Sequence, residues 1–187
     1  MGPKKPALFL DRDGVVNRNH GYVHEISDFE FFPEIFEICR IAKSSLMPIV
    51  IVTNQSGIGR GYFRESDFEI LTEWMLVKFH EEGIQIDGVF HASENPDKPT
   101  EAGSSRRKPS PTMILEAAIK LQIDLSNSIL VGDNESDMIA AMQAGIKHRI
   151  LIGIENNPNA TLVVTDHIEC SKAVRDVVLG MRDLKTT

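Results

Sequence analysis

Short, continuously apolar runs alternate with helical patterns along this chain, and this alternation constrains the possible folds more than any other feature. The runs lie at Ala7–Leu10, Met47–Val52, Gly88–His91, Ser128–Val131 and Arg149–Ile152. Continuous apolar character, in place of an apolar–polar alternation, is typical of strands that are buried on both faces of a sheet. We therefore interpret these runs as the central strands of one sheet.

Helical patterns fill the intervals between the runs. They predict helices over about 34–45, 65–82, 111–121, 135–144 and 168–184. Strands and helices in regular alternation favour a parallel sheet with right-handed crossovers. The sequence thus predicts an α/β fold, with a three-layer, Rossmann-like parallel sheet and helices on both of its faces.

Length, charge and cysteine content narrow the class of protein. A chain of 187 residues suffices for one well-buried domain and is short for two, so we expect residues 1–187 to form a single domain. The net charge of −7 argues against nucleic acid or an anionic membrane as the main partner. We expect two buried cysteines, no disulfide and no CxxC zinc pattern. With no visible signal peptide and no apolar run of about 18 residues, the chain is expected to be cytoplasmic, and we expect a monomer.

Two long polar segments do not fit the strand–helix rhythm. They are 15–32, called the flap below, and 92–107, called the 92–107 loop. Loops of this length in a compact domain are usually functional or disordered. Both follow the carboxyl ends of predicted strands, where open α/β sheets bind their ligands.

Two aspartates follow the first predicted strand, in the sequence Asp11-Arg12-Asp13-Gly14. Two carboxylates that are this close to each other repel, and burial beside the strand removes part of their hydration. A bound metal cation offsets both costs. The alternative is an ordinary aspartate that caps a helix or forms an Asx turn. The placement of both aspartates directly after an apolar strand favours the metal site.

Polar clusters also follow the later predicted strands. Residues Thr53–Gly57 offer a hydroxyl, amides and backbone N–H groups to a phosphate, although ordinary turns favour the same residues. Lys108, beside two arginines and before Pro109, can point its ammonium at a phosphate or leave it in solvent. Asp133 and Asp137 are one helical turn apart, so they can face one site or cap a helix.

In this order, DxDG, threonine, lysine and GDxxxD are the four motifs of the haloacid dehalogenase superfamily, which the chain resembles over nearly its whole length. More specifically, it resembles the heptose-1,7-bisphosphate 7-phosphatases in the segments LFLDRDGVVN, HGYVHEISDFEF, VTNQSGIGRGYF, LTEWM, RKPSP and VGDNESDM. The resemblance implies a haloacid dehalogenase-like phosphatase that is transiently phosphorylated on an aspartate.

The resemblance implies catalytic roles for four residues. Asp11 is the expected nucleophile, and Asp13 is the expected general acid and then general base. Thr53 and Lys108 are expected to bind the transferring phosphoryl group and to neutralise its charge.

The same resemblance implies a metal and a substrate. Mg²⁺ is expected on Asp11, Asp13 (through its backbone carbonyl) and Asp133, with Asp137 behind them, since this ion prefers oxygen ligands. The expected substrate is a sugar bisphosphate used to make heptose precursors of cell-surface glycans such as lipopolysaccharide. Contacts with it are expected from Asn19, His20, Gly21, Tyr22, Asn54, Gln55, Ser56, Arg107 and Asn134.

The chain departs from the family it resembles in the 92–107 loop. Relatives commonly bind a structural zinc there, on a Cys-x-His pair and a Cys-x-Cys pair. The matching positions here hold Ala92, Glu94, Ser104 and Arg106, so no thiolate remains and we expect no zinc. Relatives also often carry a basic residue at position 134 and Asp at position 19, and this chain has Asn at both. Only about forty residues separate the DxDG motif from the threonine motif, so we expect no large cap domain.

Two other functions share these motifs. Histidinol-phosphate phosphatases, or another small sugar-phosphate phosphatase, would use the same four motifs, but HGYVHE and GIGRGYF favour the heptose enzymes. A receiver-like phosphoacceptor domain also uses a strand-end aspartate, Mg²⁺, threonine and lysine on a parallel sheet. Asp13 argues against it, because a general acid and base beside the nucleophile serves turnover rather than a lasting phosphoaspartate.

Overall fold

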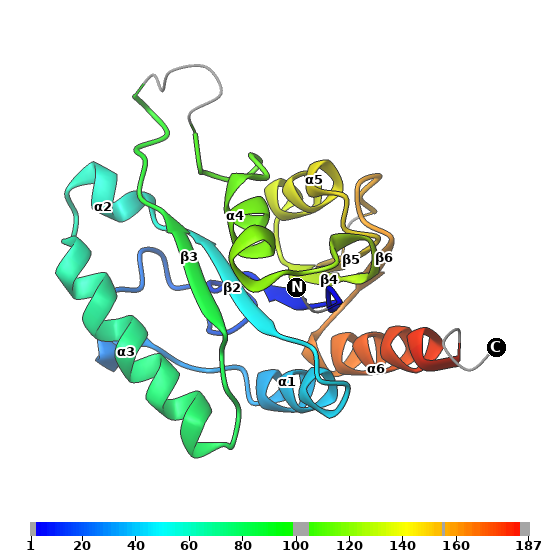
Figure 1. Cartoon of the computed structure of the whole chain (residues 1–187). Coiled ribbons are helices and arrows are strands. Elements are labelled where there is room, and N and C mark those ends of the chain that lie inside the picture. Colours follow the sequence, from blue (N-terminus) through cyan, green and yellow to red (C-terminus); the bar gives the residue numbers. More distant parts are fainter. Residues whose placement is uncertain (1–2, 99–104, 155, 184–187) are drawn as a thin grey trace.

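The computed structural model describes residues 3–98, 105–154 and 156–183. Its centre is one six-stranded sheet in the order β3–β2–β1–β4–β5–β6, in which every neighbouring pair is parallel (Figure 1). The strands are β1 (Leu8–Leu10), β2 (Ile49–Asn54), β3 (Gly88–Ala92), β4 (Ile129–Gly132), β5 (His148–Ile152) and β6 (Leu162–Val164). The predicted parallel α/β fold is confirmed.

Helices connect the strands and cover both faces of the sheet. They are α1 (Glu34–Ser44), α2 (Ser56–Arg60), α3 (Glu65–Glu81), α4 (Thr112–Leu121), α5 (Glu135–Ala144) and α6 (His167–Asp183), with 3-10 turns η1 (Ile26–Asp28) and η2 (Leu125–Asn127). Between β1 and β2, where every residue is described, the helices are η1 and α1. That segment therefore contains no large cap domain, as expected.

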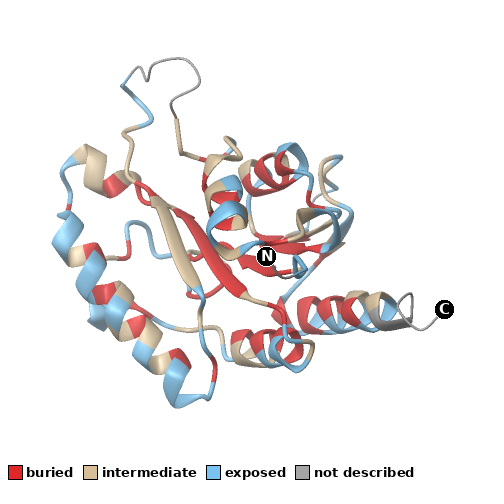
Figure 2. Ribbon diagram, in the orientation of Figure 1, coloured by how far each residue is buried: buried red, intermediate tan, exposed pale blue. Residues whose placement is uncertain are grey.

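Alternate residues of β1 show how the three layers form. Leu8 and Leu10 point into a core cluster that includes residues of α1, α3 and α6. Ala7 and Phe9 point into a second cluster on the opposite face, with residues of α4 and α5. Because both faces of the strand are covered, β1 is fully buried, as its continuous apolar sequence predicts (Figure 2).

The site forms at the carboxyl ends of the central strands, where β1 lies between β2 and β4. Leu8 is paired with Ile49 of β2 on one side and with Ile129 of β4 on the other. Connections leave the two halves of such a sheet toward opposite faces, which opens a crevice at the carboxyl ends of the central strands. The loops that follow β1, β2 and β4 meet at this crevice.

The sequence patterns do not predict the short elements of the fold. The five-residue helix α2 lies where a turn is expected, and the three-residue strand β6 and the two 3-10 turns lie outside the predicted elements. Gly57 and Gly59 of α2 are both required by close packing: a Cβ on Gly57 would lie 2.1 Å from the Phe63 ring, and one on Gly59 would lie 2.2 Å from the Ser93 carbonyl oxygen. Contacts of this kind leave no periodic signal in the sequence.

Both cysteines, Cys39 and Cys170, are free and buried, as expected. In the part of the chain that the structure describes, no helix combines the length and apolar character needed to cross a membrane.

Candidate active site

A cavity of about 490 Å³ opens at the carboxyl edge of the sheet. It brings together loops that are far apart in the sequence, and nearly all of the predicted site residues contribute to its wall. The wall consists of Asp11, Asp13, Asn19, Tyr22, Thr53, Asn54, Gln55, Ser56, Gly57, Arg107, Lys108, Pro109, Asp133, Asn134, Ser136 and Asp137. Two predicted substrate contacts, His20 and Gly21, lie outside this wall.

Lys108 lies at the centre of the site. Its Nζ is 2.7 Å from Oδ1 of Asp11 and 2.6 Å from Oδ1 of Asp137, and it donates a hydrogen bond to the Val52 carbonyl oxygen at 2.8 Å. Burial alone would lower the pKa of the ammonium, but Asp11 and Asp137 outweigh that effect and raise it. Lys108 is therefore a buried ammonium that two carboxylates share.

Asn54 fixes the backbone of Lys108. Its side-chain amide donates to the Lys108 carbonyl oxygen at 3.1 Å and accepts from the Lys108 N–H at 2.9 Å. This reciprocal pair connects the end of β2 to the loop before α4. It explains how a lysine far from the sheet in sequence reaches the crevice.

Three carboxylates converge beside the lysine. One oxygen each from Asp11, Asp133 and Asp137 lies within 4.8 Å of the others. Burial raises the pKa of Asp11 and of Asp133, and repulsion from Asp137 adds to both shifts, whereas Lys108 opposes them. One ammonium cannot balance three carboxylates, so the donor set and its charge fit a further, oxygen-preferring cation.

Gly14 makes room for this cluster. A Cβ at this position would lie 1.9 Å from Oδ2 of Asp133, and the residue has φ +95°. Both the close approach and the left-handed backbone require glycine. This is the physical reason for the glycine in DxDG.

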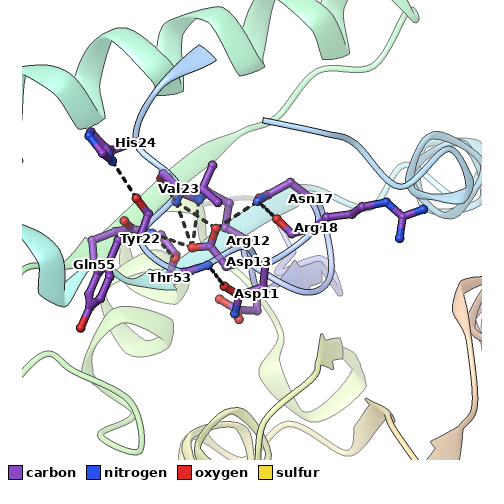
Figure 3. A network of polar contacts seen from close by, with 12 residues as sticks. Asp11, Arg12, Asp13, Asn17, Arg18, Tyr22, Val23, His24, Thr53 and Gln55 are labelled. Carbon is purple, nitrogen blue, oxygen red and sulfur yellow. Dashed lines mark hydrogen bonds and ion pairs between the residues drawn. The ribbon is translucent and has the colours of Figure 1, made fainter. Parts of the chain in front are cut away.

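Asp13 is held by three side chains. It accepts hydrogen bonds from Arg12 at 2.9–3.2 Å, from Nδ2 of Asn17 at 3.0 Å and from Nε2 of Gln55 at 2.9 Å. The same Gln55 nitrogen donates to Oγ1 of Thr53, so Gln55 links the two motifs (Figure 3). Gln55 also lines the cavity, and its expected contact with the substrate stays a prediction.

The flap supplies one wall of the cavity. Gly21 and Tyr22 have left-handed backbones, with φ +81° and +53°, and this turn brings Tyr22 to the cavity. His24 hydrogen-bonds the Tyr22 carbonyl oxygen at 2.7 Å, and the Tyr22 ring packs edge-on against Tyr62 beyond α2. His20 is exposed beside Glu30. The substrate-binding roles expected of His20 and Gly21 stay predictions.

The 92–107 loop is closed by direct contacts between described residues. Oε1 of Glu94 accepts a hydrogen bond from the Arg106 N–H at 2.6 Å, and the Arg106 guanidinium pairs with Glu116 of α4. Two positions that matched zinc ligands thus bind each other; Ser104 lies outside the described residues. Next to this contact, Arg107 lines the cavity, and its Nη1 is buried without a hydrogen-bond partner among the described residues.

Some residues of the site were not predicted. Pro109 and Ser136 line the cavity, while Arg12 and Asn17 donate hydrogen bonds to Asp13. Arg12 carried a signal that could have been used. A charged residue between two site aspartates, directly after a buried strand, must itself find a buried partner.

The chain is similar to known phosphatases over most of its length. Residues 105–163 match the family model described as HAD-hydrolase-like. The D-glycero-beta-D-manno-heptose-1,7-bisphosphate 7-phosphatase of Yersinia pestis is 45% identical over 155 residues, covering 81% of this chain and 82% of that protein. The alpha-anomer enzyme of Burkholderia mallei is 44% identical over 178 residues, covering 94% and 93%.

The chain belongs to the D-glycero-D-manno-heptose-1,7-bisphosphate 7-phosphatase family. The chain is also similar to a solved structure, the D,D-heptose 1,7-bisphosphate phosphatase of B. bronchiseptica complexed with magnesium and phosphate. That neighbour has a TM-score of 0.80 at 26% identity, covering 91% of this chain and 98% of its own. The predicted resemblance is confirmed, and membership of this phosphatase family favours an enzyme over the receiver-like phosphoacceptor alternative.

Proposed function

We propose that this chain removes the C7 phosphate of D-glycero-D-manno-heptose 1,7-bisphosphate and leaves the C1 phosphate in place. The observation that carries the proposal is the placement of Asp11 in the cavity, 2.7 Å from the buried Lys108 ammonium and beside the carboxylate cluster. The names of the relatives supply the substrate. The product would be a heptose 1-phosphate for cell-surface glycans such as lipopolysaccharide.

The proposed reaction has two steps. An Asp11 carboxylate oxygen attacks phosphorus and forms an aspartyl phosphate, while the bond from phosphorus to the C7 oxygen breaks and Asp13 gives that oxygen a proton. Asp13 then takes a proton from the water that attacks the aspartyl phosphate, which releases inorganic phosphate and restores Asp11. Thr53 and Lys108 bind the phosphoryl oxygens during both steps.

The carboxylate cluster fits Mg²⁺. Asp11, Asp133 and the backbone carbonyl of Asp13 would hold the ion, and when bound it neutralises the charge of the carboxylates and the phosphoryl group. Asp137 is the less suitable ligand, because its two oxygens already face the Lys108 ammonium and accept the Asn134 N–H. Asp137 would therefore lie outside the set of metal ligands and hold the Lys108 ammonium.

The distal C1 phosphate is assigned to Arg107. Arg107 lines the cavity beside Lys108, and its Nη1 lacks a partner among the described residues, so the guanidinium has a hydrogen-bond donor left for an anion. The flap, 15–32, would add sugar contacts through Asn19 and Tyr22, opposite Asn134. We propose that residues 1–187 act as one phosphatase domain, without zinc in the 92–107 loop.

A substrate panel tests this function. Phosphate release is measured on the alpha and beta anomers of heptose 1,7-bisphosphate, on histidinol phosphate and on fructose 1,6-bisphosphate. The expected result is the highest kcat/KM on a heptose bisphosphate. A preference for histidinol phosphate over every bisphosphate would refute the assignment and support the related family instead.

A further inference from the structure

Arg12 is the largest side chain that is fully buried among the described residues, with 1% of its surface exposed. It stands between Asp11 and Asp13, but it does not line the cavity. A buried guanidinium is costly unless its donors are paired, so the partners of Arg12 show what the site gains from it.

One partner is the carboxylate of Asp13. Nε of Arg12 donates to Oδ2 at 3.2 Å, and Nη2 lies 3.0 Å from Oδ1 and 2.9 Å from Oδ2. The guanidinium therefore holds both carboxylate oxygens of its neighbour. A planar fork of this kind fixes the orientation of a carboxylate, which a point charge such as lysine cannot do.

The second partner is the flap. Nη2 also donates to the Val23 carbonyl oxygen at 2.7 Å, and Phe68 of α3 lies under the guanidinium, 5.8 Å from its ring centroid to Cζ. Figure 3 shows Arg12 between Asp13 and Val23, on the side away from Asp11. One nitrogen thus connects the acid–base residue to the segment that forms a wall of the cavity.

We propose that Arg12 is a positioning residue that fixes the carboxylate of Asp13 and the flap as one unit. The proposal rests on the proposed phosphatase function, in which Asp13 protonates the leaving oxygen. A catalytic group accelerates the reaction only when it is correctly oriented, and a small displacement of the group lowers the rate considerably. Arg12 acts through Asp13, so its loss weakens the proton transfer and leaves the attack by Asp11 intact.

Leaving-group dependence isolates this effect. An alkyl oxygen, as in a sugar phosphate, needs a proton to depart, whereas 4-nitrophenolate leaves readily without one. The variable measured is kcat/KM on fructose 1,6-bisphosphate divided by kcat/KM on 4-nitrophenyl phosphate. We expect this ratio to fall about 10²-fold in Arg12→Met, the lower end of general acid–base effects, and less in Arg12→Lys. Incomplete folding of a variant scales both rates equally and leaves the ratio unchanged.

The matched control is Arg18→Gln. Arg18 belongs to the same segment but is exposed and pairs with Glu30, so its loss should keep both rates and their ratio. An unchanged ratio in Arg12→Met would overturn the positioning role. Failure of the proposed function is seen separately, as a wild-type enzyme that does not prefer a heptose bisphosphate.

A second readout needs no activity. Tryptic cleavage after Arg18, followed by mass spectrometry, reports how often the flap opens. Loss of the bond to Val23 should accelerate this cleavage about tenfold in Arg12→Met, given the usual strength of a charged hydrogen bond. Cleavage at the wild-type rate would overturn the proposed tether.

Discussion

The ammonium of Lys108 lies 2.7 Å from Oδ1 of Asp11, in a position where only 3% of the lysine is exposed. The same ammonium holds Asp137 at 2.6 Å. Asp11, the nucleophile of the proposed reaction, therefore shares one buried ammonium with Asp137. The Asp137 carboxylate is itself buried and has little contact with solvent. This relationship makes Lys108 important for both stability and rate.

Lys108→Met should lower kcat/KM by about 10²–10³-fold, as loss of one buried group that stabilises transition-state charge usually does. It should also lower the free energy of unfolding by roughly 3–5 kcal/mol, because Asp137 stays buried without its cation. Steady-state kinetics and urea unfolding measure the two effects. Lys147→Met, in the exposed turn before β5, is the control, and a Lys108→Met enzyme with wild-type kinetics would contradict the assignment.

Arg107→Ala should lower kcat/KM for heptose 1,7-bisphosphate by roughly 10²-fold, the value of a charged hydrogen bond of about 1.5–3 kcal/mol. It should barely change the rate on an aryl phosphate, which has no distal phosphate. The exposed Arg175 of α6 offers a control, Arg175→Ala. Equal losses on the two substrates would mean that Arg107 acts at the reacting phosphate or in folding.

The 92–107 loop should contain no zinc, because Glu94 and Arg106 bind each other and neither side chain offers a thiolate or an imidazole. Elemental analysis of the purified protein is expected to find no stoichiometric zinc, and one tightly bound zinc per chain would overturn this interpretation.

Glu94→Ala should raise KM for the bisphosphate about three- to tenfold, because the hydrogen bond from the Arg106 N–H, next to Arg107, is lost. Glu116→Ala should have less effect, since its ion pair with Arg106 is well exposed.

The sequence predicted the sheet and most of the site because these depend on local signals. Continuous apolar runs identified β1, β2 and β4, and the polar residues that follow them became the cavity wall. The short elements α2 and β6 carry too few residues for a periodic signal, and tertiary packing decides their structure.

The support behind the site was harder to predict. The DxDG pattern predicts no role for Arg12, although its side chain pairs with both Asp13 and Val23. Glu94 and Arg106 bind each other although they are twelve residues apart in the sequence. Side-chain partners across loops of this kind depend on three-dimensional packing, which spacing alone does not give.

His167 should make stability depend on pH. Burial lowers its pKa below the usual value, while its Nε2 donates to the Val15 carbonyl oxygen at 3.0 Å and its ring stacks on Phe32. A lowered folded-state pKa means that the stabilisation is present above about pH 6.5 and is lost as pH falls through the folded-state value.

Thermal unfolding between pH 7 and pH 5 measures this dependence. His167→Phe keeps the ring on Phe32 and should lose less stability on acidification than the wild type. His80→Phe, on the exposed side of α3, controls for removal of a histidine. Identical pH profiles for the wild type and His167→Phe would show that His167 is not the responsible group.

The central claim is that Asp11 is the nucleophile. Its most direct test is the rate of phosphate release from heptose 1,7-bisphosphate by Asp11→Asn relative to the wild type, at saturating Mg²⁺. Asparagine keeps the size of the side chain but removes the attacking oxygen anion, so the covalent pathway is lost. The account predicts a loss of more than about 10⁴-fold, comparable to other losses of a nucleophile. An Asp11→Asn enzyme within tenfold of the wild-type rate would contradict it.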